Sequence, residues 1–80
     1  MYFKKSEHTV PYEDKYANIV RINLYKVRFI RLYNEDTIYF YFGNGQQVAW
    51  KYVNKQKAME TLNEIDNVTN MDVLVSGKQN

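Results

Sequence analysis

The feature that most constrains the fold is the stretch 36–53, in which two strand-like runs flank the tripeptide Gly43-Asn44-Gly45. The run 37–42 is aromatic and β-branched, and such residues suit a pleated, half-buried strand. Glycine and asparagine adopt a positive φ at little cost, so the tripeptide indicates a tight turn. The stretch therefore predicts a β-hairpin.

Two registers of this hairpin compete. A two-residue loop centred on Asn44-Gly45 would pair Val48 with Tyr41, whereas a three-residue loop with Gly45 in a left-handed bulge would pair Val48 with Phe40. In the second register one face would hold Ile38, Phe40, Phe42, Val48 and Trp50, and the other Thr37, Tyr39, Tyr41, Gln47, Ala49 and Lys51. A one-residue slip moves every side chain to the opposite face, so we expect the cleaner, three-residue register. The tyrosine face then lies outward, or under something other than the main core.

The length of 80 residues predicts one small domain. The absence of cysteine excludes disulfides and thiolate metal sites and suits a reducing compartment. No apolar run approaches the roughly 18 residues that cross a bilayer, and the first residues do not resemble a signal peptide. We therefore expect a cytoplasmic protein without a membrane partner.

The chain before the hairpin divides into two parts. Residues 1–17 predict a weakly ordered arm, in which Pro11 limits any strand to a sheet edge. Residues 19–33 are strand-like, but their apolar positions change parity along the run. They form either one long bulged strand or two strands broken near Tyr25 and Lys26. A polar turn at 34–36 leads into the hairpin, and antiparallel strands are expected throughout 19–53.

The chain after the hairpin predicts a helix over 54–67, with Asn54 as its N-cap and Ala58, Leu62 and Ile65 on its apolar face. Residues 71–75 predict a short strand, and 76–80 a frayed tail. The expected fold class is α+β: an antiparallel sheet of about four strands with one helix packed on one face.

Catalytic and metal sites find little support in the sequence. The single histidine, His8, lies in the predicted arm. A zinc site needs about three or four protein ligands, and a chain without cysteine can hardly supply them. The adjacent acids at 13–14 and 35–36 are typical of solvated turns rather than of a general acid and base. We therefore expect no enzyme, no metal and no cofactor.

The favoured function is non-enzymatic binding in nucleic-acid machinery, through a basic and tyrosine-rich sheet surface. Lysine and arginine supply affinity for phosphates, and flat rings stack on unpaired bases. The candidate residues are Arg21, Lys26, Arg28, Arg31, Tyr39, Tyr41 and Lys51, with Tyr25 beside them. The competing interpretation is that these tyrosines only cover a thin core and the basic residues are a solvated face.

The alternative function is protein recognition, because tyrosine, tryptophan and arginine dominate many protein interfaces. The helix face Lys57, Glu60 and Glu64 is the candidate surface for a partner protein. An exposed edge strand could also pair with a second copy, which would give a homodimer.

The run DTIYFYFGNGQQVAWKYVNKQKAMETLNEID, less than half of the chain, resembles strand-turn-strand-helix modules of small phage and mobile-element proteins of low-GC bacteria. Such proteins include sheet-type DNA-binding modules, as in integrase arm-binding domains, and anti-CRISPR inhibitors. The resemblance implies a partner that is either nucleic acid or a nucleic-acid-processing host protein, such as a nuclease or defence protein that this chain would inhibit in the host cytoplasm. It transfers no functional residue.

Overall fold

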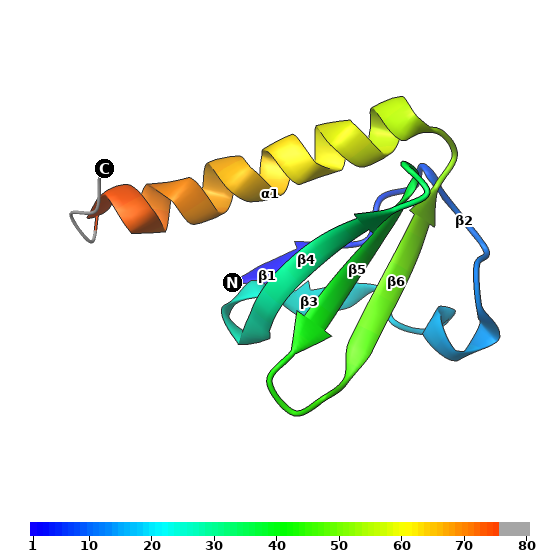
Figure 1. Cartoon of the computed structure of the whole chain (residues 1–80), viewed down its shortest axis with the longest axis horizontal. Coiled ribbons are helices and arrows are strands. Elements are labelled where there is room, and N and C mark those ends of the chain that lie inside the picture. Colours follow the sequence, from blue (N-terminus) through cyan, green and yellow to red (C-terminus); the bar gives the residue numbers. More distant parts are fainter. Residues whose placement is uncertain (76–80) are drawn as a thin grey trace.

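The computed structural model describes residues 1–75, and the side chains of residues 1–69 (Figure 1). The strands are β1 (Tyr2–Lys4), β2 (Thr9–Val10), β3 (Arg21–Asn23), β4 (Val27–Tyr33), β5 (Thr37–Phe42) and β6 (Gln47–Tyr52). Two 3₁₀ turns, η1 (Asp14–Tyr16) and η2 (Leu24–Lys26), and one helix, α1 (Lys55–Val75), complete the described chain.

The fold is α+β, as predicted, with one helix packed against a four-stranded antiparallel sheet of order β2-β6-β5-β4. β1 and β3 form a separate two-stranded antiparallel ribbon. In Figure 1 this ribbon lies behind the four-stranded sheet. The helix lies on the same side of the sheet, because β1 and α1 line a common groove. We call that side of the four-stranded sheet the inner face and the opposite side the outer face.

The three-residue loop of the β5–β6 hairpin is confirmed. Phe40 pairs with Val48 and Ile38 pairs with Trp50. Gly45 has a φ of 86°, and its amide donates to the carbonyl oxygen of Phe42 at 3.1 Å. A positive φ at this position is the left-handed bulge that glycine accommodates most readily.

The inner face carries the main core. Ile38, Phe40 and Trp50 are almost completely buried, and Ala58 and Ile65 of α1 are buried with them. The indole Nε1–H of Trp50 donates to the carbonyl oxygen of Ile19 at 3.1 Å, so the one polar atom of this side chain is satisfied.

The strand-like run 19–33 is divided, in agreement with the second of the two predicted alternatives. β3 and β4 are separated by η2, and they belong to different sheets. The side chain of Asn23 caps η2 by accepting a hydrogen bond from the amide of Tyr25 at 3.1 Å. A further irregularity between Val27 and Phe29 leaves Arg28 as a bulge in the pairing of β4 with β5.

The fourth strand of the main sheet comes from the N-terminal segment and not from residues 71–75. β2 pairs with β6, with Thr9 opposite Tyr52, and η1 follows it with Tyr16 buried. The segment 1–17, for which a weakly ordered arm was predicted, thus contributes β1, β2 and η1.

The strand predicted at 71–75 is wrong, because α1 continues through Val75. No proline or glycine interrupts residues 55–76, so nothing in the sequence stops a helix that has already formed. The N-terminal end of the helix is as predicted, since the Asn54 side chain accepts a hydrogen bond from the amide of Lys57 at 2.9 Å. The predicted tail, 76–80, lies outside the described residues.

Candidate functional site

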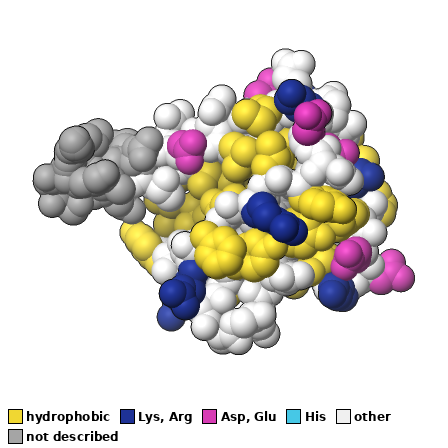
Figure 2. Space-filling model, viewed as in Figure 1, with side chains coloured by type: hydrophobic (Ala, Val, Ile, Leu, Met, Phe, Trp, Pro, Cys, Tyr) yellow, Lys and Arg dark blue, Asp and Glu magenta, His cyan; other side chains and the backbone are white. Residues whose placement is uncertain are grey.

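The outer face of the sheet brings together an arginine and four aromatic residues, and we call this set the outer aromatic face. It consists of Phe29, Arg31 and Tyr33 on β4 and Tyr39 and Tyr41 on β5. Alternate residues of a strand share a face, and the bulge at Arg28 sets which residues of β4 point outward. Figure 2 shows hydrophobic side chains gathered over β4 and β5, with basic side chains among them.

Three of these rings form a ladder of nearly parallel planes. The rings of Phe29 and Tyr41 stack with centroids 4.5 Å apart and planes 17° apart. Tyr41 also lies nearly parallel to Tyr39, at 6.0 Å and 20°. The ring of Tyr33 meets Tyr39 edge-on, at 6.0 Å and 87°. Such contacts add to the free energy gained by burying the rings, so they favour this arrangement of the ladder.

Arg31 lies at the centre of the outer aromatic face. Its guanidinium carbon is 5.2 Å from the ring centroid of Tyr39, 5.5 Å from that of Tyr33 and 5.9 Å from that of Tyr41. These distances are typical of cation–π attraction. The ion pairs found in the described part of the chain do not include Arg31. Its positive charge therefore faces solvent, and no carboxylate among the described side chains pairs with it.

Tyr39 supports the face from below. Only 9% of it is exposed, and its hydroxyl is 3.0 Å from the hydroxyl of Tyr12. That hydrogen bond, with a further contribution from burial, holds the pKa of Tyr39 well above its usual value. The phenol therefore stays neutral, and the Tyr39 ring is a platform for Arg31 rather than a contact surface for a ligand.

Three of the seven predicted nucleic-acid-binding residues meet at this point: Arg31, Tyr39 and Tyr41. Lys51 lies on the same face, two strands away from β4, because it pairs with Thr37 of β5. It is half-buried and lines a small hollow of about 110 Å³ with Tyr12.

The other three predicted residues are separate from this cluster. Arg28 is exposed at the hairpin tip, where its Cδ would be 3.4 Å from a Cβ on Gly43. Lys26, in η2, lines an open hollow near the same tip. Arg21 lies on β3, directly opposite Lys4 of β1, and so belongs to the two-stranded ribbon and not to the main sheet.

Two exposed members of the outer aromatic face were not predicted as site residues. Phe29 is 58% exposed and Tyr33 is 43% exposed. The sequence carries one sign of this exposure: the apolar positions change parity between Val27 and Ile30. Such a change indicates a bulge, and a bulge can turn a ring to the outer face of the sheet.

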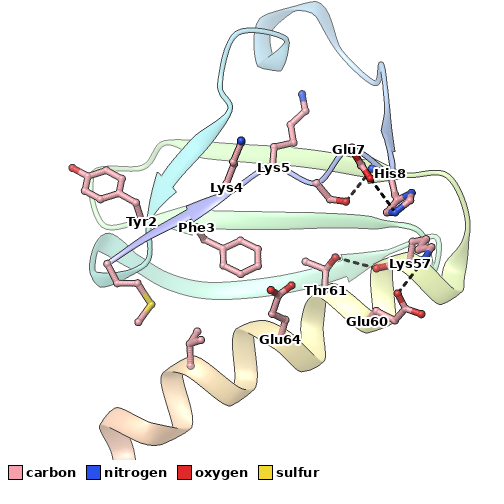
Figure 3. Close-up of a pocket in the computed structure, with 13 residues that line it drawn as sticks. Tyr2, Phe3, Lys4, Lys5, Glu7, His8, Lys57, Glu60, Thr61 and Glu64 are labelled. Carbon is pink, nitrogen blue, oxygen red and sulfur yellow. Dashed lines mark hydrogen bonds and ion pairs between the residues drawn. The ribbon is translucent and has the colours of Figure 1, made fainter.

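The helix residues predicted to bind a protein line a groove instead of an isolated helix face (Figure 3). Lys57, Glu60 and Glu64 form one wall of this groove, which has a volume of about 810 Å³, and residues 1–8 form the other. The ammonium of Lys57 is 3.4 Å from the carboxylate of Glu60. The amide of Gln56 also donates to that carboxylate, at 3.1 Å. These contacts offset the repulsion between Glu60 and Glu64 that their spacing predicts.

Metal-ligating residues do not cluster in the described part of the chain: no group of three or more His, Asp or Glu side chains could hold an ion there. Within residues 1–75, no helix combines the length and apolar character needed to cross a membrane. No protein-family model matches the chain, and neither the curated proteins nor the solved structures contain a significant match.

Proposed function

We propose that this protein binds single-stranded nucleic acid on the outer aromatic face, as a non-catalytic component of cytoplasmic nucleic-acid machinery. The observation that carries this proposal is the position of Arg31. Its guanidinium sits 5.2 to 5.9 Å from three tyrosine rings and has no ion-pair partner among the described residues. An arginine that lies on an aromatic surface and has no such partner is suited to a phosphate with a base beside it.

Single strands fit this surface better than duplexes do. A base can lie against a ring only when it is not already stacked and paired inside a helix. Further positive charge flanks the rings, with Arg28 and Lys26 near the hairpin tip and Lys51 across the sheet. A strand that crosses the face would therefore meet cations on both sides of the aromatic residues.

The test is fluorescence anisotropy of labelled single-stranded DNA, single-stranded RNA and duplex DNA, at low salt and at about 0.15 M salt. Wild-type protein is expected to bind the single strands more tightly than the duplex. Arg31→Ala is expected to weaken that binding about tenfold or more, because it removes a charge-assisted contact to phosphate.

The matched control is Arg21→Ala, which removes the same charge from the two-stranded ribbon. It is expected to change the affinity less than twofold. Circular dichroism checks that both variants are folded. Absence of binding at low salt would refute the proposal, as would equal losses in the two variants, because the binding would then follow net charge and not the outer aromatic face.

A second candidate function is inhibition of a host nuclease or defence protein, as implied by the resemblance to phage proteins. The groove between α1 and β1 favours it, because β1 pairs only with β3 among the described strands and its other edge can accept an extended segment of a partner. This function predicts a complex that persists at about 0.15 M salt. Glu60→Lys combined with Glu64→Lys should abolish that complex, whereas Arg31→Ala should leave it intact.

A further inference from the structure

We infer that Phe29 is the single stacking position of the outer aromatic face, on which one unpaired base extends the ring ladder. The inference rests on the proposed function and identifies the residue on which the base stacks. Three observations support it: the ladder ends at Phe29, the strand that carries Phe29 is an open edge, and the other rings of the face are already covered.

Phe29 ends the ladder. It stacks on Tyr41 at 4.5 Å, and no second aromatic ring contacts it in the described part of the chain. More than half of its surface is exposed. A ring with one occupied face and wide exposure leaves its other face to a planar ligand, and every nucleobase has such a face.

β4 is the outermost strand of the sheet order, so no described strand covers the side of Phe29 that faces away from Tyr41. The bulge at Arg28 twists this edge and places an arginine directly before Phe29. A bulge and exposed charges discourage the pairing of another strand with an edge. The edge is therefore open to a ligand that needs no backbone pairing.

The remaining rings have no comparable free face. Tyr39 is buried beneath Arg31, and its hydroxyl is hydrogen-bonded to that of Tyr12. Tyr41 stacks against both Phe29 and Tyr39. Tyr33 is partly covered by the guanidinium of Arg31, 5.5 Å from its centroid. The predicted platforms Tyr39 and Tyr41 thus hold Phe29 and Arg31 in place, and Phe29 contacts the base.

The positions of the charges agree with this mode of binding. Arg31 follows Phe29 by two residues on the same face of the strand, which corresponds to a separation of about 6.6 Å along β4. Arg28 lies on the other side of Phe29, toward the hairpin tip. A nucleotide stacked on Phe29 therefore has a cation on each side for its flanking phosphates.

The experiment combines a protein change with a ligand change. The ligands are a labelled oligothymidylate of roughly a dozen nucleotides and an abasic oligomer of equal length, which keeps the phosphates and lacks the bases. Phe29→Leu keeps an apolar side chain and removes the ring, whereas Phe29→Trp enlarges the ring. Tyr2→Leu removes an exposed ring from β1, in the separate two-stranded ribbon, and is the matched control.

Phe29→Leu is expected to weaken binding of oligothymidylate about 5- to 150-fold, the range for loss of one stacked base. Phe29→Trp should bind at least as tightly as wild type, and its fluorescence should be quenched by the oligomer. Tyr2→Leu should change affinity less than twofold. The abasic oligomer should bind wild type weakly and should show no further loss with Phe29→Leu, because the same contact is already missing.

Two results would overturn the inference, and they differ in what they leave standing. If wild type binds both oligomers equally while Arg31→Ala still weakens binding about tenfold or more, the site recognises phosphate alone: the proposed function stands and the role of Phe29 is wrong. If neither oligomer binds wild type at low salt, the proposed function and the inference fail together.

Discussion

Tyr52 occupies an unusual position for a side chain with a polar atom. It is 1% exposed, and its hydroxyl has no hydrogen-bond partner among the described residues. The hydroxyl of the neighbouring Thr61 already donates to the carbonyl oxygen of Lys57 at 3.0 Å. Burial raises the pKa of Tyr52 to about 12, and the Thr61 side chain offsets only part of that rise.

Tyr52→Phe is expected to leave the free energy of unfolding at neutral pH unchanged or to increase it by about 1 kcal/mol, because it removes a buried, unpartnered hydroxyl. The folded pKa of about 12 exceeds the ordinary value of 10.0, so the folded state keeps a proton that the unfolded state loses. This contribution to stability is complete below pH 10.0 and is lost as the pH rises to about 12. Between pH 9 and 12, the free energy of unfolding measured with urea should therefore fall less steeply for Tyr52→Phe than for wild type.

Tyr25→Phe serves as the control, because Tyr25 is 70% exposed. Its decline at alkaline pH should parallel that of wild type. Parallel declines for all three proteins would show that Tyr52 does not hold its proton in the folded state.

The residues of the candidate site could be predicted only in part. The hairpin pattern places Tyr39 and Tyr41 on one face, and the run of basic residues points to Arg31. The burial of Tyr39 depends on a hydroxyl contact with Tyr12, 27 positions earlier, and no local pattern reports such a contact. The exposure of Phe29 depends on the bulge at Arg28. The bulge decides which residues of β4 point outward, and its position is known only once the pairing of β4 with β5 is known.

Among the elements, the β4–β5 connection carries local backbone strain. Asn34 and Glu35 have φ values of 54° and 67°, and the amide of Asp36 donates to the carbonyl oxygen of Tyr33 at 3.3 Å. Two consecutive positive φ values are characteristic of a type I′ turn, for which Asn-Gly is the preferred pair. Asparagine tolerates this conformation, but glutamate does so at a cost.

Glu35→Gly should raise the free energy of unfolding by about 0.5 to 1 kcal/mol, since relief of the strain outweighs the added freedom of the unfolded chain. Urea denaturation measures the change. Glu35→Ala removes the same charge and keeps a Cβ, so it should give no comparable gain. Equal stabilisation by both variants would assign the effect to charge and not to backbone conformation.

Most elements could be predicted from local patterns. The elements that could not be predicted in this way depend on distant partners. The hairpin register followed from the segregation of its two faces, and the helix start from the Asn54 cap. The end of α1 was missed because residues 71–75 are apolar enough to suit a strand as well as a helix. β2 was missed because it has two residues and exists only through its pairing with β6.

At the scale of the whole molecule, the net charge of +2 is too small to attract nucleic acid by itself. Any salt dependence must therefore come from a local set of cations. If the strand contacts Lys26, Arg28, Arg31 and Lys51, the plot of log affinity against log salt should have a slope of about −3. Arg31→Ala should make that slope less steep by about 0.7.

Lys55→Ala removes one exposed charge from the start of α1 and is the control for this measurement. It should leave the slope unchanged. A slope near zero for wild type would mean that phosphate contacts do not drive the binding.

The pairing of β2 with β6 also affects how the chain folds during its synthesis. Thr9 must wait for Tyr52, its partner 43 positions later, before the main sheet can be completed. At ribosomal rates of about 5 to 20 residues per second, that delay is roughly 2 to 9 s. Strands β4, β5 and β6 pair with their neighbours in the chain and can form first. β2 is therefore the segment that stays unpaired during this delay, and it is already available to cover the outer edge of β6 when that strand emerges.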